Sequence, residues 1–310
     1  MTQFAMVFPG QGSQSLGMLS ALAAESQLIE QTFAEASEAL GYDLWALVHN
    51  GPEEELNKTW QTQPALLAAS VAIFRVWKEK KGPMPAIMAG HSLGEYSALV
   101  CAGVIDFKAA IKLVELRGKL MQEAVPAGTG AMYAIIGLDN ESIEKACEKS
   151  AQGQVVSPVN FNSPGQVVIA GEKDAVERAG VACKEAGAKR ALPLSVSVPS
   201  HCALMKPAAE KLALALQEIE FNEPNFLIIN NVDVKIEQSA ENIRDALVRQ
   251  LYNPVRWTET VELISSQGVE LLVEVGPGKV LTGLTKRIVS NLTAFAANDP
   301  VSLATALENL

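Results

Sequence analysis

The chain has 310 residues, of which 48% are hydrophobic and 19% charged, so it is long enough to bury a large core in one or two domains. Its formal net charge of −10 at pH 7 argues against binding to nucleic acid. The longest apolar stretch, residues 65–74, is too short to span a bilayer, so we expect no membrane association.

The cysteines and the N-terminus both indicate a reducing compartment. No C-x-x-C pair is present, which predicts free thiols and argues against a local zinc site. The first eight residues lack a basic stretch ahead of an apolar one, so we expect no signal peptide and a cytoplasmic location. The cysteines are Cys101, Cys147, Cys183 and Cys202.

The first predicted strand, residues 4–8, ends in a glycine-rich turn at residues 9–14. The turn is not a phosphate loop, because a dinucleotide fingerprint needs glycine where Ser15 stands and a Walker loop needs lysine where Met18 stands. The turn can present backbone N–H groups to a ligand or can simply reverse the chain, and the spacing leaves both interpretations open.

Helical patterns follow at residues 17–40 and 64–80, and a strand at 83–89 leads into Gly90-His-Ser-Leu-Gly94. A G-x-S-x-G sequence between a strand and a helix is typical of a nucleophile elbow, which exposes the serine hydroxyl at the carboxyl end of a sheet. The pattern therefore predicts that Ser92 is a nucleophile. The alternative is a tight strand-to-helix turn in which Ser92 caps the helix.

The helix predicted at residues 107–125 carries one charged residue on its apolar face. Its other charged side chains share one arc, whereas Arg117 falls among leucines, valine and methionine. Two structural interpretations are open, a side chain that snorkels to water and a buried ion pair. The functional interpretation is a guanidinium that grips a substrate carboxylate with two parallel hydrogen bonds.

After residue 127 the pattern changes to strand, helix, two strands, helix and strand, ending near residue 196. This β-α-β-β-α-β order is that of a ferredoxin-like unit, so we predict a small domain at residues 127–198. Residues 1–126 and 199–310 then form a large α/β-hydrolase-like domain, in which strand–helix repeats predict a mostly parallel sheet covered on both faces. A cleft between two domains is a usual place for a ligand site.

A nucleophilic serine needs a base, and the chain has three histidines. His49 precedes an acidic helix, and His91 is the neighbour of Ser92 on the elbow and should point away from it. His201 lies where the chain re-enters the large domain, so by elimination it is the candidate base. No Asp or Glu stands out as its orienting partner, so a dyad oriented by a backbone carbonyl is an alternative to a triad.

Several segments together resemble the malonyl-CoA:acyl-carrier-protein transacylases of bacterial type II fatty-acid synthesis, and the resemblance runs from end to end. They are Phe8–Gln14, Gln63–Leu66, Gly90–Glu95, Arg117, Asn162–Gln166, Ser200-His201, Gln250, Pro254-Val255 and Glu274–Gly278.

This resemblance implies a role for each matching residue. Ser92 is the nucleophile, His201 the base and Arg117 the partner of the malonyl carboxylate. The backbone N–H groups of Gln11 and Leu93 form the oxyanion hole, and the backbone carbonyl of Gln250 orients His201.

The implied reaction is a ping-pong transfer from malonyl-CoA to acyl carrier protein, with no metal and no cofactor beyond the CoA thioester. Two basic pairs, Lys189-Arg190 and Lys286-Arg287, are candidate contacts for an acidic carrier protein. Ser200 departs from the phenylalanine that related polyketide acyltransferases often have before the histidine, so a methylmalonyl-tolerant acyltransferase is an alternative.

Two rivals come from other functional classes. A serine esterase or thioesterase would use the same elbow with water as the acceptor. A docking protein with an unused elbow would form no acyl adduct at all.

Overall fold

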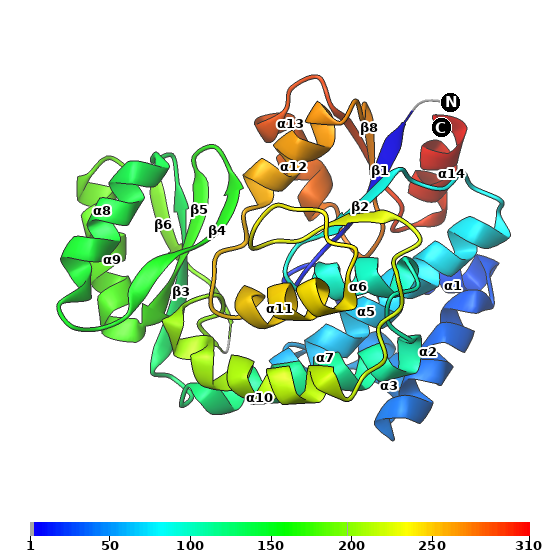
Figure 1. The fold of residues 1–310 in the computed structure, drawn as a ribbon, viewed down its shortest axis with the longest axis horizontal. Helices are drawn as coiled ribbons and strands as arrows, with labels where there is room; N and C mark the ends of the chain where they lie inside the picture. Colours follow the sequence, from blue (N-terminus) through cyan, green and yellow to red (C-terminus); the bar gives the residue numbers. More distant parts are fainter. Residues whose placement is uncertain (1–2, 197) are drawn as a thin grey trace.

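The computed structural model describes residues 3–196 and 198–310 and places them in two β-sheets surrounded by helices (Figure 1). Among the helices of these residues, none combines the length and apolar composition that crossing a bilayer requires. Met1, Thr2 and Ser197 lie outside the described residues, and so do the parts of the signal-peptide and domain predictions that fall on them.

The first sheet consists of five parallel strands in the order β7-β2-β1-β8-β9. All five residues of its middle strand, β1, are buried, as expected for a parallel sheet covered on both faces. Pairing of Phe8 with Gly90 brings the turn after β1 beside the elbow after β2. The strands are β1 (Phe4–Phe8), β2 (Ile87–Gly90), β7 (Leu227–Ile229), β8 (Leu271–Glu274) and β9 (Thr293–Ala296).

Helices cover both faces of this sheet. Alternate residues of β1 enter two separate apolar cores, Phe4, Met6 and Phe8 on one face and Ala5 and Val7 on the other. The second face is covered by α12 (Trp257–Ser266) and α13 (Val280–Ile288). The first core is built with α1 (Ser20–Glu25), α2 (Leu28–Leu40), α3 (Leu44–Asn50), α4 (Glu53–Leu56), α5 (Thr59–Glu79), α6 (Leu93–Cys101), α7 (Phe107–Ala124), η1 (Ala203–Met205), α10 (Lys206–Gln217), α11 (Ala240–Gln250) and α14 (Pro300–Glu308).

The second sheet has four antiparallel strands in the order β4-β5-β3-β6. Its elements follow one another as β3 (Gly130–Ile136), α8 (Asn140–Ala151), β4 (Val156–Ser163), β5 (Gln166–Glu172), α9 (Lys173–Glu185) and β6 (Arg190–Pro193). Both helices pack on one face of this sheet. Its other face contacts Cys202, and Val255 hydrogen-bonds to β4, so this sheet is joined to the rest of the molecule.

The mixed α/β fold with a mostly parallel sheet is confirmed, together with a small antiparallel sheet. Several details of the sequence prediction are wrong. Strand β2 begins at Ile87 and not at residue 83, because Pro83 and Pro85 lack the N–H group that a ladder needs. Helix α5 begins at Thr59 and not at residue 64, and strand β9 with helix α14 was not predicted.

Candidate active site

The turn between β2 and α6 has the geometry of a nucleophile elbow. Ser92 adopts a φ of 51° and a ψ of −107°, a strained conformation for a residue with a side chain. A Cβ on Gly90 would lie 1.9 Å from the carbonyl carbon of Gly94, so this turn requires glycine. The Ser92 side chain makes no capping hydrogen bond to α6, so the alternative of a helix cap is wrong.

The hydroxyl of Ser92 points instead at His201. Ser92 Oγ lies 2.8 Å from Nε2 of His201, and Nδ1 of the same ring lies 2.7 Å from the backbone oxygen of Gln250. Because a carbonyl oxygen can only accept, Nδ1 carries the proton and the Nε2 lone pair faces the serine. His201 is itself held at a φ of 63°, and its N–H donates to the Leu251 carbonyl.

The surroundings of His201 keep the ring neutral. Burial first, and then the positive charge of Arg117, lowers the pKa of His201 to about 3. The imidazole therefore holds a free lone pair at neutral pH, as a general base must. A substrate carboxylate bound to Arg117 would offset that positive charge and make His201 more basic.

Arg117 lies inside the molecule, with 1% of its surface exposed, so the snorkelling interpretation is wrong. Its Nη1 donates to Gln63 Oε1 at 2.8 Å and its Nη2 to Gln250 Oε1 at 2.9 Å. Nη2 also lies 3.4 Å from Ser92 Oγ. Helix α7 comes this close to α5 because Gly118 has no side chain, since a Cβ there would lie 2.5 Å from the Cα of Trp60.

The interpretation of Arg117 as a structural ion pair is also wrong. None of the ion pairs among the described residues includes Arg117. Its Nε is buried without a partner in the same part of the chain. A buried positive charge held by two neutral amides and the Tyr96 ring, with no ion pair among the described residues, is costly unless a ligand supplies a counter-charge at close range.

A cavity of about 90 Å³ adjoins these side chains. It is lined on one side by residues of the elbow, the turn after β1 and α7, and on the other by residues of the second sheet and the segment that follows it. They are Gln11, His91, Ser92, Leu93, Arg117 and Met121, and Met132, Asn160, Leu194, Val196, Ser200 and His201. The cavity thus lies between residues that adjoin the first sheet and residues of the second sheet.

The two residues predicted to form an oxyanion hole both line this cavity. Leu93 is the first residue of α6, so its N–H has no acceptor within its own helix. Gln11 belongs to the turn after β1, in which Ser13 folds back onto the Gly10 carbonyl. A Cβ on Gly10 would lie 2.4 Å from the backbone oxygen of His91, so this turn packs directly on the elbow.

The hydrogen-bond partners of the other two histidines are residues other than Ser92. His91 Nε2 lies 2.8 Å from Asn162 Oδ1 and its ring packs against Trp257, whereas His49 contacts Ser20 on the surface. The structure brings together Ser92, His201, Arg117 and Gln250. In the described part of the chain, no three His, Cys, Asp or Glu side chains are grouped as metal ligands would be.

Four buried polar groups of the site were not predicted: the side chains of Gln63, Glu95, Asn231 and Gln250. The Gln250 amide bonds to Arg117, to the Ser92 carbonyl and to Glu95, and so links the charged groups to the elbow. Gln63 had the same signal as Arg117, a polar residue inside an apolar helical stretch. Asn231 follows a strand at the edge where ligands bind in such sheets.

Comparison with known proteins identifies the family. The model of the acyl transferase domain matches residues 5–305. The chain belongs to the acyl transferase family. The malonyl CoA-acyl carrier protein transacylase of Escherichia coli K12 is 73% identical over 308 residues, which cover 99% of this chain and 100% of that protein. The resemblance to this group of acyl transferases is therefore confirmed.

Two solved acyl transferase structures have the same fold. One is a malonyl-transacylase in complex with the holo form of AntF, a type II polyketide-synthase acyl-carrier protein, with 79% identity, a TM-score of 0.99 and full coverage of both chains. The other is an acyl carrier protein S-malonyltransferase from Vibrio cholerae, with 72% identity and a TM-score of 0.96, covering 98% of this chain and 100% of that one.

Proposed function

We propose that this acyl transferase moves the malonyl group of malonyl-CoA to the phosphopantetheine thiol of acyl carrier protein through a malonyl ester of Ser92. The observation that carries this proposal is the position of Arg117, a buried guanidinium that forms no ion pair with any carboxylate of the described residues and lies 3.4 Å from the hydroxyl that would hold the acyl group. An esterase for uncharged acyl groups would have no use for such a charge beside its nucleophile.

Arg117 can bind the malonyl carboxylate with one edge of its guanidinium. Nε has no partner among the described residues, and one Nη2 hydrogen is directed only at the distant Ser92 Oγ. These two N–H groups are parallel, which is the arrangement that a carboxylate accepts in a bidentate pair. Gln63 accepts from Nη1 and Gln250 from Nη2, and these two contacts fix the plane of the guanidinium.

Acylation of Ser92 uses His201 first as a base and then as an acid. Nε2 of His201 takes the hydroxyl proton while Oγ bonds to the thioester carbonyl carbon. The C–S bond then breaks, and the proton passes from Nε2 to the sulfur, so that CoA leaves as its thiol. The Gln250 carbonyl, 2.7 Å from Nδ1, stabilises the imidazolium that forms between these steps.

The second half of the reaction runs the same steps with carrier protein. The phosphopantetheine thiol gives its proton to His201 as its sulfur bonds to the ester carbonyl carbon. The bond from that carbon to Ser92 Oγ breaks, and Oγ recovers the proton. In both halves the N–H groups of Leu93 and Gln11 hold the oxyanion, and the loss of one such donor typically costs about 10²–10³ in rate.

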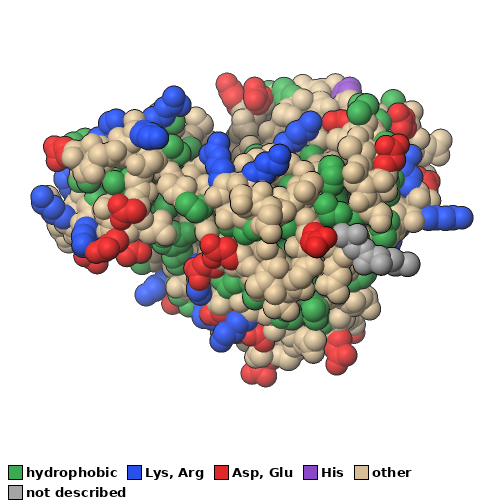
Figure 2. Space-filling model, turned by 90° about the horizontal axis from the view of Figure 1, so that it is seen from above, with side chains coloured by type: hydrophobic (Ala, Val, Ile, Leu, Met, Phe, Trp, Pro, Cys, Tyr) green, Lys and Arg blue, Asp and Glu red, His purple; other side chains and the backbone are tan. Residues whose placement is uncertain are grey.

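The architecture that we propose has a large α/β-hydrolase-like domain, residues 1–126 and 199–310, and an inserted ferredoxin-like domain, residues 127–198. The strand order β4-β5-β3-β6 with two helices on one face supports the second part. The surface is hollowed between the part that carries α8 and α9 and the rest of the molecule, and several Lys and Arg side chains, together with a group of Asp or Glu side chains, stand around the hollow (Figure 2).

That hollow suits the approach of an acidic carrier protein. Arg287, in one of the two basic pairs proposed to contact it, donates to Gln166 of β5 and so lies where the two domains meet. The cytoplasmic location and the lack of a cofactor remain predictions.

The acceptor distinguishes a transferase from a hydrolase. The protein is mixed with malonyl-CoA, with and without acyl carrier protein that bears its phosphopantetheine arm, and the products are separated. We expect malonylated carrier protein as the main product and slow release of free malonate when the carrier is omitted. Rapid malonate release that the carrier protein does not divert would show a thioesterase instead.

A further inference from the structure

The segment that follows β7, residues 230–233, supports the elbow through hydrogen bonds to its backbone. Asn231 is fully buried, and its side chain contacts the backbone of the elbow at Ser92 and at Gly90. Its Oδ1 accepts the N–H of Ser92 at 2.8 Å, and its Nδ2 donates to the Gly90 carbonyl at 2.6 Å. A shift of this segment would therefore move Ser92 directly.

The end of helix α11 supports His201, the hydrogen-bond partner of Ser92. Gln250 is its last residue, and the backbone carbonyl of Gln250 accepts the hydrogen bond from His201. The distance between Ser92 and His201 thus depends on how the 230–233 segment lies relative to the end of α11.

Gln250 Nε2 lies 3.4 Å from Asn231 Oδ1, and two stronger contacts also join these supports, the first of them inside the molecule. The buried carboxylate of Glu95 accepts the N–H of Asn231 at 3.1 Å and the side-chain amide of Gln250 at 2.8 Å. Burial raises the pKa of Glu95 to about 7. Through its two hydrogen bonds, Glu95 joins the 230–233 segment to the end of α11.

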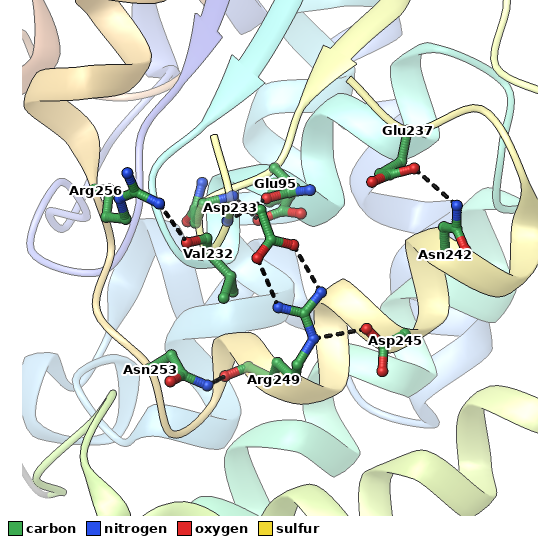
Figure 3. A network of polar contacts seen from close by, with 11 residues as sticks. Glu95, Val232, Asp233, Glu237, Asn242, Asp245, Arg249, Asn253 and Arg256 are labelled. Carbon is green, nitrogen blue, oxygen red and sulfur yellow. Dashed lines mark hydrogen bonds and ion pairs between the residues drawn. The ribbon is translucent and has the colours of Figure 1, made fainter. Parts of the chain in front are cut away.

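The second contact lies nearer the surface (Figure 3). Arg249, next to Gln250, donates Nη1 to Asp233 Oδ1 at 2.9 Å and Nη2 to Asp233 Oδ2 at 2.7 Å. Asp233 is two residues beyond Asn231. Asp245, one turn earlier on α11, accepts from Arg249 Nε at 2.6 Å, so all three nitrogens of the guanidinium are engaged.

We propose that the Asp233–Arg249 ion pair is a positioning element of the active site, which sets the distance between Ser92 and His201 by tying the 230–233 segment to the end of α11. This proposal rests on the proposed function, because it concerns the rate at which Ser92 is acylated. Neither side chain lines the cavity, so both act through Asn231 and Gln250.

The geometry of the pair suits this task. Two parallel hydrogen bonds fix direction as well as distance, which a single contact does not. Both side chains are about 30% exposed, so the pair adds little to stability compared with a buried contact. The reaction rate is far more sensitive than stability to the position of a reacting group, since a misplacement of about 1 Å can lower the rate by about 100-fold.

The test measures the single-turnover rate of Ser92 acylation at saturating malonyl-CoA, together with thermal stability. We expect Asp233→Ala and Arg249→Ala each to slow acylation by about 3- to 100-fold, within the range for a misplaced group. The double variant should be hardly slower than either single variant, because both remove the same contact. Asp233→Asn, which keeps the size of the side chain, should fall between wild type and Asp233→Ala.

The control is the ion pair between Arg75 and Glu35, which joins α5 to α2 away from the site. Its N–O distance is 2.7 Å and its side chains are 29% and 31% exposed, close to the values for the Asp233–Arg249 pair. Glu35→Ala should lower thermal stability to a similar extent and leave the acylation rate unchanged.

Two results would overturn the proposal, and they differ in what else they overturn. If Asp233→Ala loses stability as Glu35→Ala does and keeps the wild-type acylation rate, the pair is structural only and the proposed function stands. If the wild-type protein itself is not acylated by malonyl-CoA, the proposed function fails, and this proposal fails with it.

Discussion

The two sides of Ser92 differ in how their polar groups are satisfied. On the elbow side the Ser92 N–H and carbonyl and the Glu95 carboxylate are all hydrogen-bonded within the protein, through Asn231 and Gln250. On the cavity side, among the described residues, Arg117 Nε and Asn160 Oδ1 are buried without partners. Because buried polar groups are normally satisfied, the free groups of residues that line the cavity mark it as the place for a ligand, whereas the backbone of Ser92 is held by the protein.

The largest expected effect comes from removing the His201 side chain, which is hydrogen-bonded both to Ser92 and to the Gln250 carbonyl. Replacement by alanine removes the acceptor for the Ser92 proton and should slow acylation by about 10²–10⁴, the usual contribution of a general base. Stopped-flow release of CoA measures this rate. A near-normal rate in His201→Ala would mean that another group takes the proton.

An intermediate effect is expected on the cavity side at Arg117. A charge-assisted bidentate pair contributes about 1.5–3 kcal/mol, so Arg117→Ala should lower malonyl transfer by about 10- to 150-fold more than acetyl transfer. Parallel assays with malonyl-CoA and acetyl-CoA give this ratio. An equal loss with both substrates would show that Arg117 only supports the fold of the site.

The smallest effect concerns pH. The pKa of His201 is lowered from 6.5 to about 3, so the neutral base is present throughout the range above pH 3 and is lost only as the pH falls through that value. Because kcat/KM reports the free enzyme, its pH profile should show no acid limb near 6.5 that belongs to His201.

The control for the pH profile is Glu95→Gln, because the pKa of Glu95 is about 7 and its own titration falls in the same range. An inflection near neutral pH that disappears in this variant belongs to Glu95. An acid limb near pH 6.5 that persists in Glu95→Gln would contradict the buried, neutral state of His201.

The residues around the cavity could be predicted from the sequence more readily than the contacts that support the elbow. Ser92 and Arg117 each have a local signal, a turn motif and a misplaced charge on a helix, and His201 follows from the shortage of histidines. The strand–helix alternation also predicted the parallel sheet, whereas strand β9 was missed because two of its four residues are alanine, which strands disfavour.

The contacts that support the elbow have no local signal. Asn231 meets Ser92 across 139 positions, and Gln250 meets Glu95 across 155. Such contacts are set by the packing of β7 and α11 around the sheet, which the pattern of either segment alone does not contain. Only the resemblance to the family pointed to Gln250, and it did so for the backbone carbonyl and not for the side chain.

The central claim is that Ser92 carries the malonyl group. The most direct test is the intact mass of the protein after brief exposure to malonyl-CoA, followed by addition of acyl carrier protein. We predict a gain of one malonyl group that is absent in Ser92→Ala and that disappears when the carrier protein becomes malonylated. A gain of the same mass in Ser92→Ala, or an adduct that the carrier protein never removes, would contradict the account.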